Sequence, residues 1–413
     1  MPIRKIFHAS DVHEDVDAFR GFTNFASAQG ADALVVSGDW SLLPCRRDDY
    51  RSLLAQRSFV QERPQLITSL DRGMVSLLAK HGPGRGLDAV AAAVQQEGVA
   101  QAYKVVFPEV AQRRLRRAHQ EYMVPLLRQM YDMVCEPGIP VVGVGGNYDP
   151  LMADILGESD VHARKRDVAG FRWRGYSGGN ANPGYVGVLE DFGITSHFDE
   201  SELEDVMIRA YIDDKREQPA APVLWVIHNP PLFVTDALGM EGGGHGGSPL
   251  LLQQLLRPSL VPRKGKRVLF CGHIHEAGPH GNAAIFQDRQ LYESVVPSQY
   301  GAGSFRCMPG VGAVQTSRGE VIPVINSGNL GRFDIKNFPS PAELADRRWS
   351  PDRSLLQTVH AFDFGTFSRV DMRDDGSIEQ VVQYSLMDKS ALGGRSVGKV
   401  RELRTVPGKF FTF

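Results

Sequence analysis

The sequence predicts an α/β protein, and three patterns lead to this prediction. Five short apolar runs, rich in β-branched residues, each end in polar residues, as buried strands of α/β proteins do. These runs are residues 3–13, 32–40, 139–149, 221–231 and 266–276. Stretches with helical spacing lie between several of them, and after residue 320 apolar and polar residues alternate. This alternation predicts a strand-rich second sheet, with a hairpin turn at 373–377.

Three helices are predicted between these runs. The first covers residues 14–29, directly after the first run. The second covers 200–216 and follows Asp199, whose carboxylate suits the cap position. The third covers 248–257 and opens with a Ser-Pro pair, which favours a helix start. Such an alternation of strands and helices is typical of a sheet whose faces are covered by helices.

Two stretches interrupt this order. Residues 41–138 carry apolar residues at a spacing of three and four, which indicates a helical insertion. It either packs on the core or forms a cap that selects the substrate. Residues 276–320 are rich in Gly, Pro and Ser and are predicted to form a long loop of the kind that often serves as a lid. The main domain is then expected at 1–40 and 139–413.

The bulk composition is typical of a soluble globular protein. The chain has 413 residues, of which 42% are hydrophobic and 23% charged, with a formal net charge of −2. This charge argues against binding of a nucleic-acid backbone as the main task. The four cysteines show no CxxC spacing, so neither a disulfide framework nor a zinc–thiolate site is indicated. Because no apolar run approaches the roughly 18 residues of a bilayer span and no signal peptide precedes the first strand, we expect a cytoplasmic protein without a membrane partner.

Side chains with metal-binding chemistry follow all five predicted strands. They are Asp11, His13, Asp39, Asn147, His228, His273 and His275. Glycine precedes three of them and lets the backbone turn sharply there. Because strand ends at one edge of such a sheet converge, these side chains can meet at one point. Imidazole and carboxylate ligands without thiolate suit Zn, Fe, Mn, Ni or Co better than Ca.

Each of these signals is weak by itself, whereas the ordered set is specific. A single histidine after a strand is more often a satisfied core residue than a ligand. His273 and His275 are a stronger signal, because residues two positions apart point the same way from an extended segment. Five such strand ends in order favour a metal site over a purely structural explanation.

The order DxH, GD, GN, H and GHxH resembles the calcineurin-like metallophosphoesterase superfamily. The stretch "VIHNPPLFVTDALGMEGGGHGGSPLLLQQLL", followed by "FCGHIHEAG" and "VINSGNLG", is similar to its cyclic-nucleotide-phosphodiesterase-like branch. That branch has a His-x-Pro-Pro strand end, a Gly-His-x-Gly-Ser loop and a downstream Asn-x-Gly. The resemblance covers residues 3–40, 140–275 and about 320–335. It implies an αββα sandwich of two mixed sheets flanked by helices, with the catalytic domain at 1–40 and 139–413.

The same resemblance implies a site for two metal ions, with manganese expected first and Fe, Zn, Ni or Co as alternatives. The ions would take three ligands each and share one carboxylate: Asp11, His13 and His275 for one, Asn147, His228 and His273 for the other, and Asp39 between them. Two such ions clamp the attacking and leaving oxygens of an in-line displacement. They also lower the pKa of a bridging water, which gives a hydroxide for attack on phosphorus. A phosphate ester is therefore the implied substrate.

Two further residues are candidates for contact with the phosphate or the leaving group. Tyr148 replaces a histidine that much of the superfamily has after the asparagine, and a phenol is a poorer proton donor at pH 7 than imidazole. It either donates a hydrogen bond to a phosphate oxygen or packs. His245, within "GMEGGGHGGS", is the candidate for the missing acid, with a solvent-exposed loop histidine as the alternative. With Asp39 and Asn147, these residues form the predicted catalytic set.

The leading prediction is a dinuclear-metal phosphodiesterase acting on a small phosphate ester, with nucleotides as one substrate class. A nuclease would use the basic run at 113–120, which is more typical of a solvated helix face. A phosphomonoesterase acting on proteins or small molecules is a further alternative, and the missing histidine disfavours the protein phosphatase among these. A non-catalytic scaffold on the same fold is an alternative of another class, against which the complete ligand set argues. The oligomeric state is not indicated by the sequence.

Overall fold

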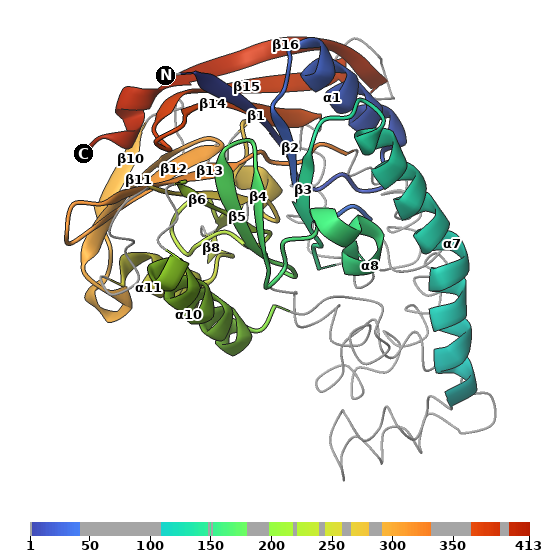
Figure 1. The fold of residues 1–413 in the computed structure, drawn as a ribbon, viewed down its shortest axis with the longest axis horizontal. Helices are drawn as coiled ribbons and strands as arrows, with labels where there is room; N and C mark the ends of the chain where they lie inside the picture. The colour runs from blue at the N-terminus through green and yellow to red at the C-terminus, as the bar shows by residue number, and fades with distance from the viewer. Residues whose placement is uncertain are drawn as a thin grey trace, which may run out of the picture.

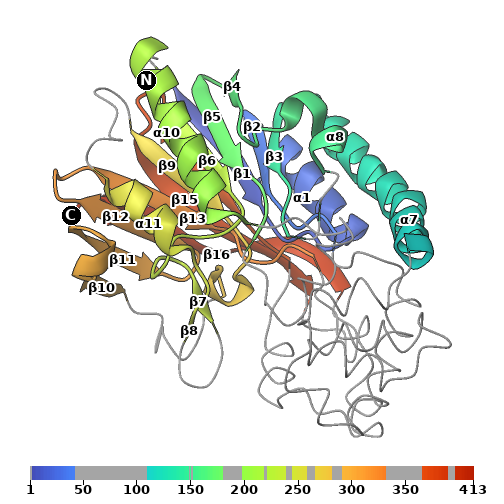
Figure 2. The ribbon, with the colours of Figure 1, turned by 90° about the horizontal axis from the view of Figure 1, so that it is seen from below.

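Two stacked β-sheets with helices on their outer faces form the protein (Figures 1 and 2). The computed structural model describes residues 2–41, 109–147, 149, 152–179, 198–217, 221–238, 244–257, 266–280, 291–331, 365–388 and 396–413. The two sheets are both mixed, and a two-stranded ribbon accompanies them. This arrangement confirms the predicted αββα sandwich.

The first sheet has six strands in the order β16-β15-β14-β1-β2-β3. Its strands are Ile3–Ala9 (β1), Ala33–Ser37 (β2), Val141–Val144 (β3), Thr366–Arg373 (β14), Ile378–Asp388 (β15) and Ser396–Pro407 (β16). β1, β2 and β3 run parallel, whereas β14 pairs antiparallel with β1 and with β15. The predicted hairpin at 373–377 is confirmed, with Gly376 at a φ of 80° in its turn.

The second sheet has eight strands in the order β10-β11-β12-β13-β9-β6-β5-β4. Its strands are Lys165–Val168 (β4), Phe171–Tyr176 (β5), Val223–Ile227 (β6), Arg267–Cys271 (β9), Tyr292–Val295 (β10), Gly303–Met308 (β11), Val311–Thr316 (β12) and Val321–Asn326 (β13). The strands after residue 320 were expected to form a sheet of their own, and this expectation is wrong. β13 pairs with β9, whereas β14 pairs with β1, so they belong to different sheets.

Helices cover the outer faces of both sheets (Figure 2). They are Val16–Ala28 (α1), Glu109–Cys135 (α7), Met152–Leu156 (α8), Glu200–Glu217 (α10) and Pro249–Leu256 (α11), with short 3₁₀ turns at Gly157–Ser159 (η1), His275–Ala277 (η3), Ser298–Tyr300 (η5) and Gly408–Phe411 (η7). α1 and α7 pack on the six-stranded sheet, and α10 and α11 on the eight-stranded sheet. Every helix in the described ranges is too short or too polar for a bilayer span.

The caps that the sequence predicts hold two of these helices. The Asp199 carboxylate accepts hydrogen bonds from the backbone of Ser201 and Glu202 at the start of α10, at 2.8 and 3.0 Å. The Ser248 hydroxyl accepts one from Leu251 N at 2.9 Å at the start of α11. These bonds satisfy N–H groups that have no partner within the helix.

The main core lies between the two sheets. Val35 and Val142 from one sheet meet Leu224 and Phe270 from the other, and all four side chains are fully buried. Burial of each such side chain stabilises the fold by roughly 1.5–3 kcal/mol. Since the two sheets share this layer, the loops at their common edge are held in fixed relative positions.

The structure bears differently on the two predicted interruptions of the strand order, the insertion at 41–138 and the loop at 276–320. The helix expected near the end of 41–138 is found as α7, which contacts α1, while residues 42–108 lie outside the described residues. The long loop expected at 276–320 is wrong for much of that range, because β10, β11 and β12 lie within it. β11 and β12 form a hairpin whose turn contains Gly310 at a φ of 78°.

Candidate metal centre

The loops after five strands meet at one edge of the sandwich and are joined by backbone hydrogen bonds. Asp11 N donates to Gly38 O at 2.9 Å, and His13 N donates to Asp39 O at 3.0 Å, which joins the loops after β1 and β2. In the other sheet, Gly272 N donates to His228 O at 2.9 Å, which joins the loops after β9 and β6. The expected convergence is therefore present, but it draws on both sheets and not on a single one.

Four of the candidate ligands have a left-handed backbone conformation. Asp11, His13, Asp39 and His273 have φ values of 53°, 50°, 49° and 66°. Such a conformation costs of order 1–3 kcal/mol for a non-glycine residue and is enriched at functional sites. The neighbouring glycines are also required, since a Cβ added at Gly146 would overlap the Asp39 carboxylate and backbone. The strain is concentrated where the side chains must converge.

Asp11, His13 and His275 form the first of two groups with metal-ligand geometry. One ligand atom from each lies within 4.8 Å of the others. His275 Nε2 lies 2.9 Å from Asp11 Oδ1 and 3.1 Å from His13 Nε2. Two imidazole nitrogens at 3.1 Å repel each other unless a proton or a cation lies between them. The donor set therefore fits a divalent cation.

Asp39, His228 and His273 form the second group, again within 4.8 Å. Asn147 joins it, because its Oδ1 lies 3.2 Å from His228 Nε2. Gly179 lies against this group: a Cβ added there would be 3.0 Å from atoms of Asn147, His228 and His273 alike. The space above these three side chains is thus kept open by the absence of a side chain at Gly179.

Asp11 also ties the two groups together. Its Oδ2 accepts the His273 N–H at 3.0 Å, while its Oδ1 faces His275. On the other side, His228 Nε2 lies 3.5 Å from Asp39 Oδ2. The resemblance implied Asp39 as the shared ligand, and the structure places Asp39 with the second group. The bridging role stays a prediction.

Backbone carbonyls orient two of the imidazoles. His228 Nδ1 donates to Ser37 O at 2.7 Å, and His13 Nδ1 lies 3.4 Å from Ser41 O. A carbonyl only accepts, so Nδ1 carries a hydrogen and Nε2 is the nitrogen that can bind a metal ion or a second proton. Both Nε2 atoms face the other candidate ligands, which is the tautomer that metal coordination needs.

The electrostatics of the ligand groups favour cation binding. Burial acts to raise the pKa of Asp11, but His275 outweighs it and keeps this carboxyl ionised well below its ordinary range. Burial and the nearby His275 lower the pKa of His13 to about 3, so this imidazole is neutral. Burial opposes charge on His228, yet Asp39 raises the pKa of His228 to about 9. A proton on His228 therefore occupies a position that a metal ion would take, and binding should release it.

Asp149 fixes the loops that carry Asp39 and Asn147. Its Oδ2 accepts hydrogen bonds from Trp40 N at 2.9 Å and Gly146 N at 2.8 Å. Its Oδ1 accepts from Ser41 N at 2.9 Å and from the Ser41 hydroxyl at 2.7 Å. This buried carboxylate orients the backbone on both sides of the second group.

Asn326 fixes the loop that carries the two C-terminal histidines. Its fully buried Nδ2 donates to Ile274 O at 3.1 Å and to Thr235 O at 3.0 Å. Ile274 lies between His273 and His275, so the bond fixes the loop between two ligands. The sequence contained this residue in the stretch "VINSGNLG", but nothing local assigned it a role.

The sequence also suggested no role for two other asparagines, Asn229 and Asn329, that lie near the ligand loops. Asn229 directly follows His228, and Asn329 precedes Leu330, whose N–H donates to Ser10 O at 3.0 Å. Both side chains are buried, and neither amide has a hydrogen-bond partner among the described residues. A buried polar group left in this state costs roughly 1–3 kcal/mol. Such groups fit a site that holds further polar ligands.

The predicted catalytic residues outside the ligand groups are only partly described. Tyr148 lies outside the described residues. His245 lies on a small two-stranded ribbon, Ala237–Leu238 (β7) and Gly244–His245 (β8), which follows the loop after β6. Its Nδ1 is 2.8 Å from Asp236 Oδ1, and this bond raises the pKa of His245. His245 is therefore an oriented side chain, although more than a third of it is exposed.

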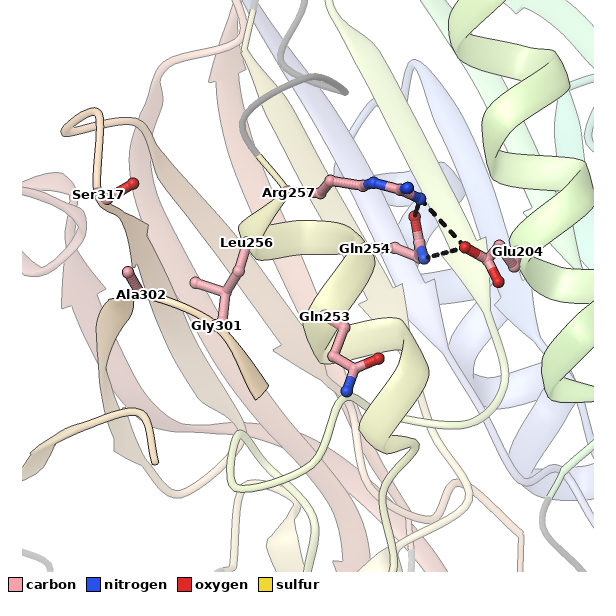
Figure 3. Close-up of a pocket in the computed structure, with 8 residues that line it drawn as sticks. All are labelled: Glu204, Gln253, Gln254, Leu256, Arg257, Gly301, Ala302 and Ser317. Atoms are coloured by element: carbon pink, nitrogen blue, oxygen red, sulfur yellow. Dashed lines mark hydrogen bonds and ion pairs between the residues drawn. The ribbon is translucent and has the colours of Figure 1, made fainter. Parts of the chain in front are cut away.

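A hollow of about 380 Å³ lies elsewhere, beside the C-terminal end of α11 (Figure 3). It contains none of the candidate ligands. Three of its polar side chains bond one another: Gln254 Nε2 and Arg257 Nη1 each donate to Glu204 Oε1 at 3.1 Å (Figure 3). Since these groups are already satisfied, the hollow gives no indication of a second site.

Comparison with known proteins finds solved structures that are similar to this chain at low identity and low TM-score. No protein-family model and no curated protein matches the sequence. A solved structure of TT1561 of Thermus thermophilus is similar with 12% identity and a TM-score of 0.38, over 80% of this chain and 92% of that chain. A dimetal phosphatase from Danio rerio is similar with 11% identity and a TM-score of 0.38, over 98% and 99% of the two chains. At these values, the site geometry carries the functional argument and the comparisons do not.

Proposed function

We propose that this protein is a phosphoesterase with a dinuclear metal centre, and that its substrate is a phosphodiester. The observation that carries the proposal is the pair of ligand groups at one edge of the sandwich, which hold Asp11, His13 and His275, and Asp39, His228 and His273. The preference for a diester, with small nucleotides as one class, rests on the resemblance to the cyclic-nucleotide-phosphodiesterase-like branch.

The chain's own residues prepare the centre in three ways. Asp11 stays ionised beside His275, and Asp39 adds a second buried carboxylate that offsets cationic charge. The carbonyls of Ser37 and Ser41 present imidazole Nε2 atoms to the centre. Two bound ions would supply positive charge for the phosphate and an activated water for attack on phosphorus. Imidazole and carboxylate ligands suit Mn, Fe, Zn, Ni or Co. The resemblance favours manganese among these metals.

The other predicted catalytic residues keep distinct roles in this proposal. Asn147 completes the second group, beside His228. Tyr148 is the candidate for a hydrogen bond to a phosphate oxygen, and His245 is the candidate for proton donation. The insertion at 41–138 is assigned to substrate selection or to packing on the core. We place the protein in the cytoplasm.

Metal titration of the purified protein, followed by assays with bis-p-nitrophenyl phosphate and p-nitrophenyl phosphate, tests the proposal. We expect two Mn ions per chain and faster turnover of the diester, with all activity lost on chelation. His273→Ala should lose activity by more than the roughly 10–100-fold typical of removing a group that only orients a ligand. Asp39→Asn should do the same and keep the fold.

The alternatives predict other results in the same assays. Faster turnover of the monoester would favour a phosphomonoesterase. Turnover of single-stranded DNA or RNA in preference to small diesters would favour a nuclease. Absence of both bound metal and activity would favour a scaffold protein. Full activity of Asp39→Asn with Mn would show that the assignment of Asp39 is wrong.

A further inference from the structure

Asp236 and His245 form a carboxylate–imidazole pair at the β7–β8 ribbon, which contacts the turn that begins at His275. The Asp236 side chain is almost fully buried, at 1% exposure, whereas His245 is 37% exposed. Asp236 Oδ1 lies 2.8 Å from His245 Nδ1, and its Oδ2 accepts the Gly247 N–H at 3.1 Å. The carboxylate therefore holds the Nδ1 hydrogen and leaves Nε2 as the outward nitrogen of the ring.

The ring of His245 is fixed from a second direction. Phe233 meets it edge to face, with ring centroids 4.8 Å apart. Phe233 in turn packs against Tyr300 and Phe305, at 5.6 and 5.9 Å between ring centroids. An imidazole held by a buried carboxylate and by an aromatic ring has few accessible orientations, which distinguishes it from an ordinary exposed loop histidine.

The ribbon that carries the pair is fastened to the metal-ligand loops. β7 contacts η3, the turn that begins at His275. The Asn326 amide donates to Thr235 O, next to Asp236, and to Ile274 O, between the two histidines. Both bonds come from one nitrogen, so the position of Asp236 relative to the ligand loop is set by a single buried side chain.

The base of the ribbon is closed against the loop that follows His228. Ser248 N donates to Pro230 O at 2.8 Å, and Leu232 N donates to Ser248 O at 3.0 Å. Gly247 packs so closely on Pro231 that a Cβ there would overlap its carbonyl. The pair is therefore held between the loops of His228 and His275, one from each ligand group.

From this geometry we infer that His245 is the catalytic acid that protonates the leaving oxygen, that Asp236 is its positioning residue, and that the substrates are esters of weakly acidic alcohols. The inference rests on the proposed phosphoesterase function and deepens it. An alkoxide is a poor leaving group, so esters of ordinary alcohols gain most from proton donation. The sequence-level departure at Tyr148, which removes the usual imidazole, agrees with an acid from another loop.

The step balances in atoms and electrons. The bond between phosphorus and the leaving oxygen breaks with its electron pair on that oxygen, which takes the proton from His245 Nε2. A water oxygen forms the new bond to phosphorus, and its released proton passes to solvent. His245 is then reprotonated from solvent, and Asp236 retains its hydrogen bond to Nδ1 throughout.

Two diesters of the same shape test the inference: diphenyl phosphate and bis-p-nitrophenyl phosphate, which differ in the basicity of the leaving oxygen. His245→Gln and Asp236→Asn should each lose about 100-fold in kcat on diphenyl phosphate, in the range of general acid catalysis, and less than about tenfold on the nitrophenyl ester. Asp375→Asn is the matched control, since it removes a carboxylate that holds a backbone turn, as Asp236 does. That turn packs against Pro222, at the opposite end of β6 from His228.

A second readout is independent of activity. In the metal-free protein, NMR titration should show the His245 pKa above its ordinary value, and Asp236→Asn should lower it. Three results would overturn the inference and leave the proposed function intact. One is an equal loss of kcat on both esters in the two variants, and another is an unchanged His245 pKa in Asp236→Asn. The third is a wild-type protein that hydrolyses the nitrophenyl ester but not diphenyl phosphate. A wild-type protein that hydrolyses neither ester would overturn both.

Discussion

Asp149 shapes the candidate site although it is not one of the candidate metal ligands. Its two oxygens receive four hydrogen bonds from the loops after β2 and β3, including those of Trp40 N and Gly146 N. Asp39 precedes Trp40 and Asn147 follows Gly146, so two candidate ligands depend on one carboxylate. The partners of this aspartate lie on the loops after two different strands, so they could be recognised only from the fold.

We expect Asp149→Asn to weaken both the fold and metal binding. The amide NH₂ would face two backbone or hydroxyl donors, and a buried donor left without an acceptor costs roughly 1–3 kcal/mol. Urea denaturation gives the loss in unfolding free energy, and Mn titration gives the loss in affinity. Asp375→Asn, in the exposed β14–β15 turn, is the control and should leave Mn affinity unchanged. An unchanged Mn affinity in Asp149→Asn would contradict the role of Asp149 in orienting the ligand loops.

The Asp236–His245 pair gives a pH dependence with a defined sign. The hydrogen bond from His245 Nδ1 to Asp236 raises the folded-state pKa of His245 above 6.5, so the folded protein binds this proton more tightly than the unfolded chain. Its stabilising effect is complete below pH 6.5 and is lost as the pH rises through the folded-state value. The difference in unfolding free energy between wild type and Asp236→Asn should therefore be larger at about pH 5.5 than at about pH 8.5. An equal difference at both pH values would exclude this linkage.

At the scale of the structural elements, glycines determine how closely the loops that carry the candidate ligands approach one another. The loops after β2 and β3 meet so tightly that any side chain at Gly146 would overlap Asp39. Gly30, after α1, has a φ of 68°, yet nothing lies within 4 Å of its added Cβ. A substitution at Gly146 therefore tests steric overlap, whereas a substitution at Gly30 tests backbone strain alone.

We expect Gly146→Ala to abolish binding of one of the two metal ions and to destabilise the fold by about 1–3 kcal/mol, as overpacking does. Gly30→Ala should destabilise by a similar amount through its backbone conformation, with both ions still bound. Metal content and thermal unfolding of the two variants make the comparison. Two bound ions in Gly146→Ala would show that the loops tolerate a wider separation.

Local sequence signals predicted the helices better than the sheets. The caps Asp199 and Ser248 act through neighbours three residues away, so α10 and α11 start where the sequence places them. The β11–β12 hairpin was missed, although Gly310 follows a proline between two alternating stretches, a recognisable turn signal. The high content of glycine and proline across residues 276–320 led to the prediction of a loop there, and the turn signal was overlooked.

Strand partners could not be read from local sequence because they depend on distant segments. β13 and β14 have similar alternating patterns, yet one pairs with β9 and the other with β1. The same limit applies to the site. The seven ligand positions follow strand ends and carry their own chemical signal, whereas Asn326 and Asp236 contribute through contacts that only the packed sandwich creates.

At the scale of the whole molecule, the metal centre draws on both sheets. Asp11 belongs to the six-stranded sheet and His275 to the eight-stranded sheet, and their side chains lie 2.9 Å apart. Bound ions should therefore stabilise the packing of one sheet on the other. The orphaned amides of Asn229 and Asn329 lie in the same region, so the metal-free protein has unsatisfied groups there, among the residues that the structure describes.

We expect Mn to raise the unfolding free energy by about 2.7 kcal/mol when its free concentration is about 100 times Kd, by mass action on the folded state. Chelation should reverse the rise. His228→Ala should retain a smaller rise from the first group, while Asp11→Ala should lose most of it, because Asp11 contacts both groups. Denaturation curves with and without Mn measure these shifts. An Mn-independent midpoint in the wild type would contradict a centre built across the sheets.

The pairing of β1 with β14 has a consequence for biosynthesis. Ile3 is opposite Arg373, so one edge of the strand before Asp11 has no native neighbour until residue 373 has left the ribosome. At about 5–20 residues per second, that interval lasts roughly 20–70 s. During this time the backbone N–H and C=O groups at that edge of β1 are open to wrong pairing. The first ligands to be synthesised are thus among the last to reach their final positions.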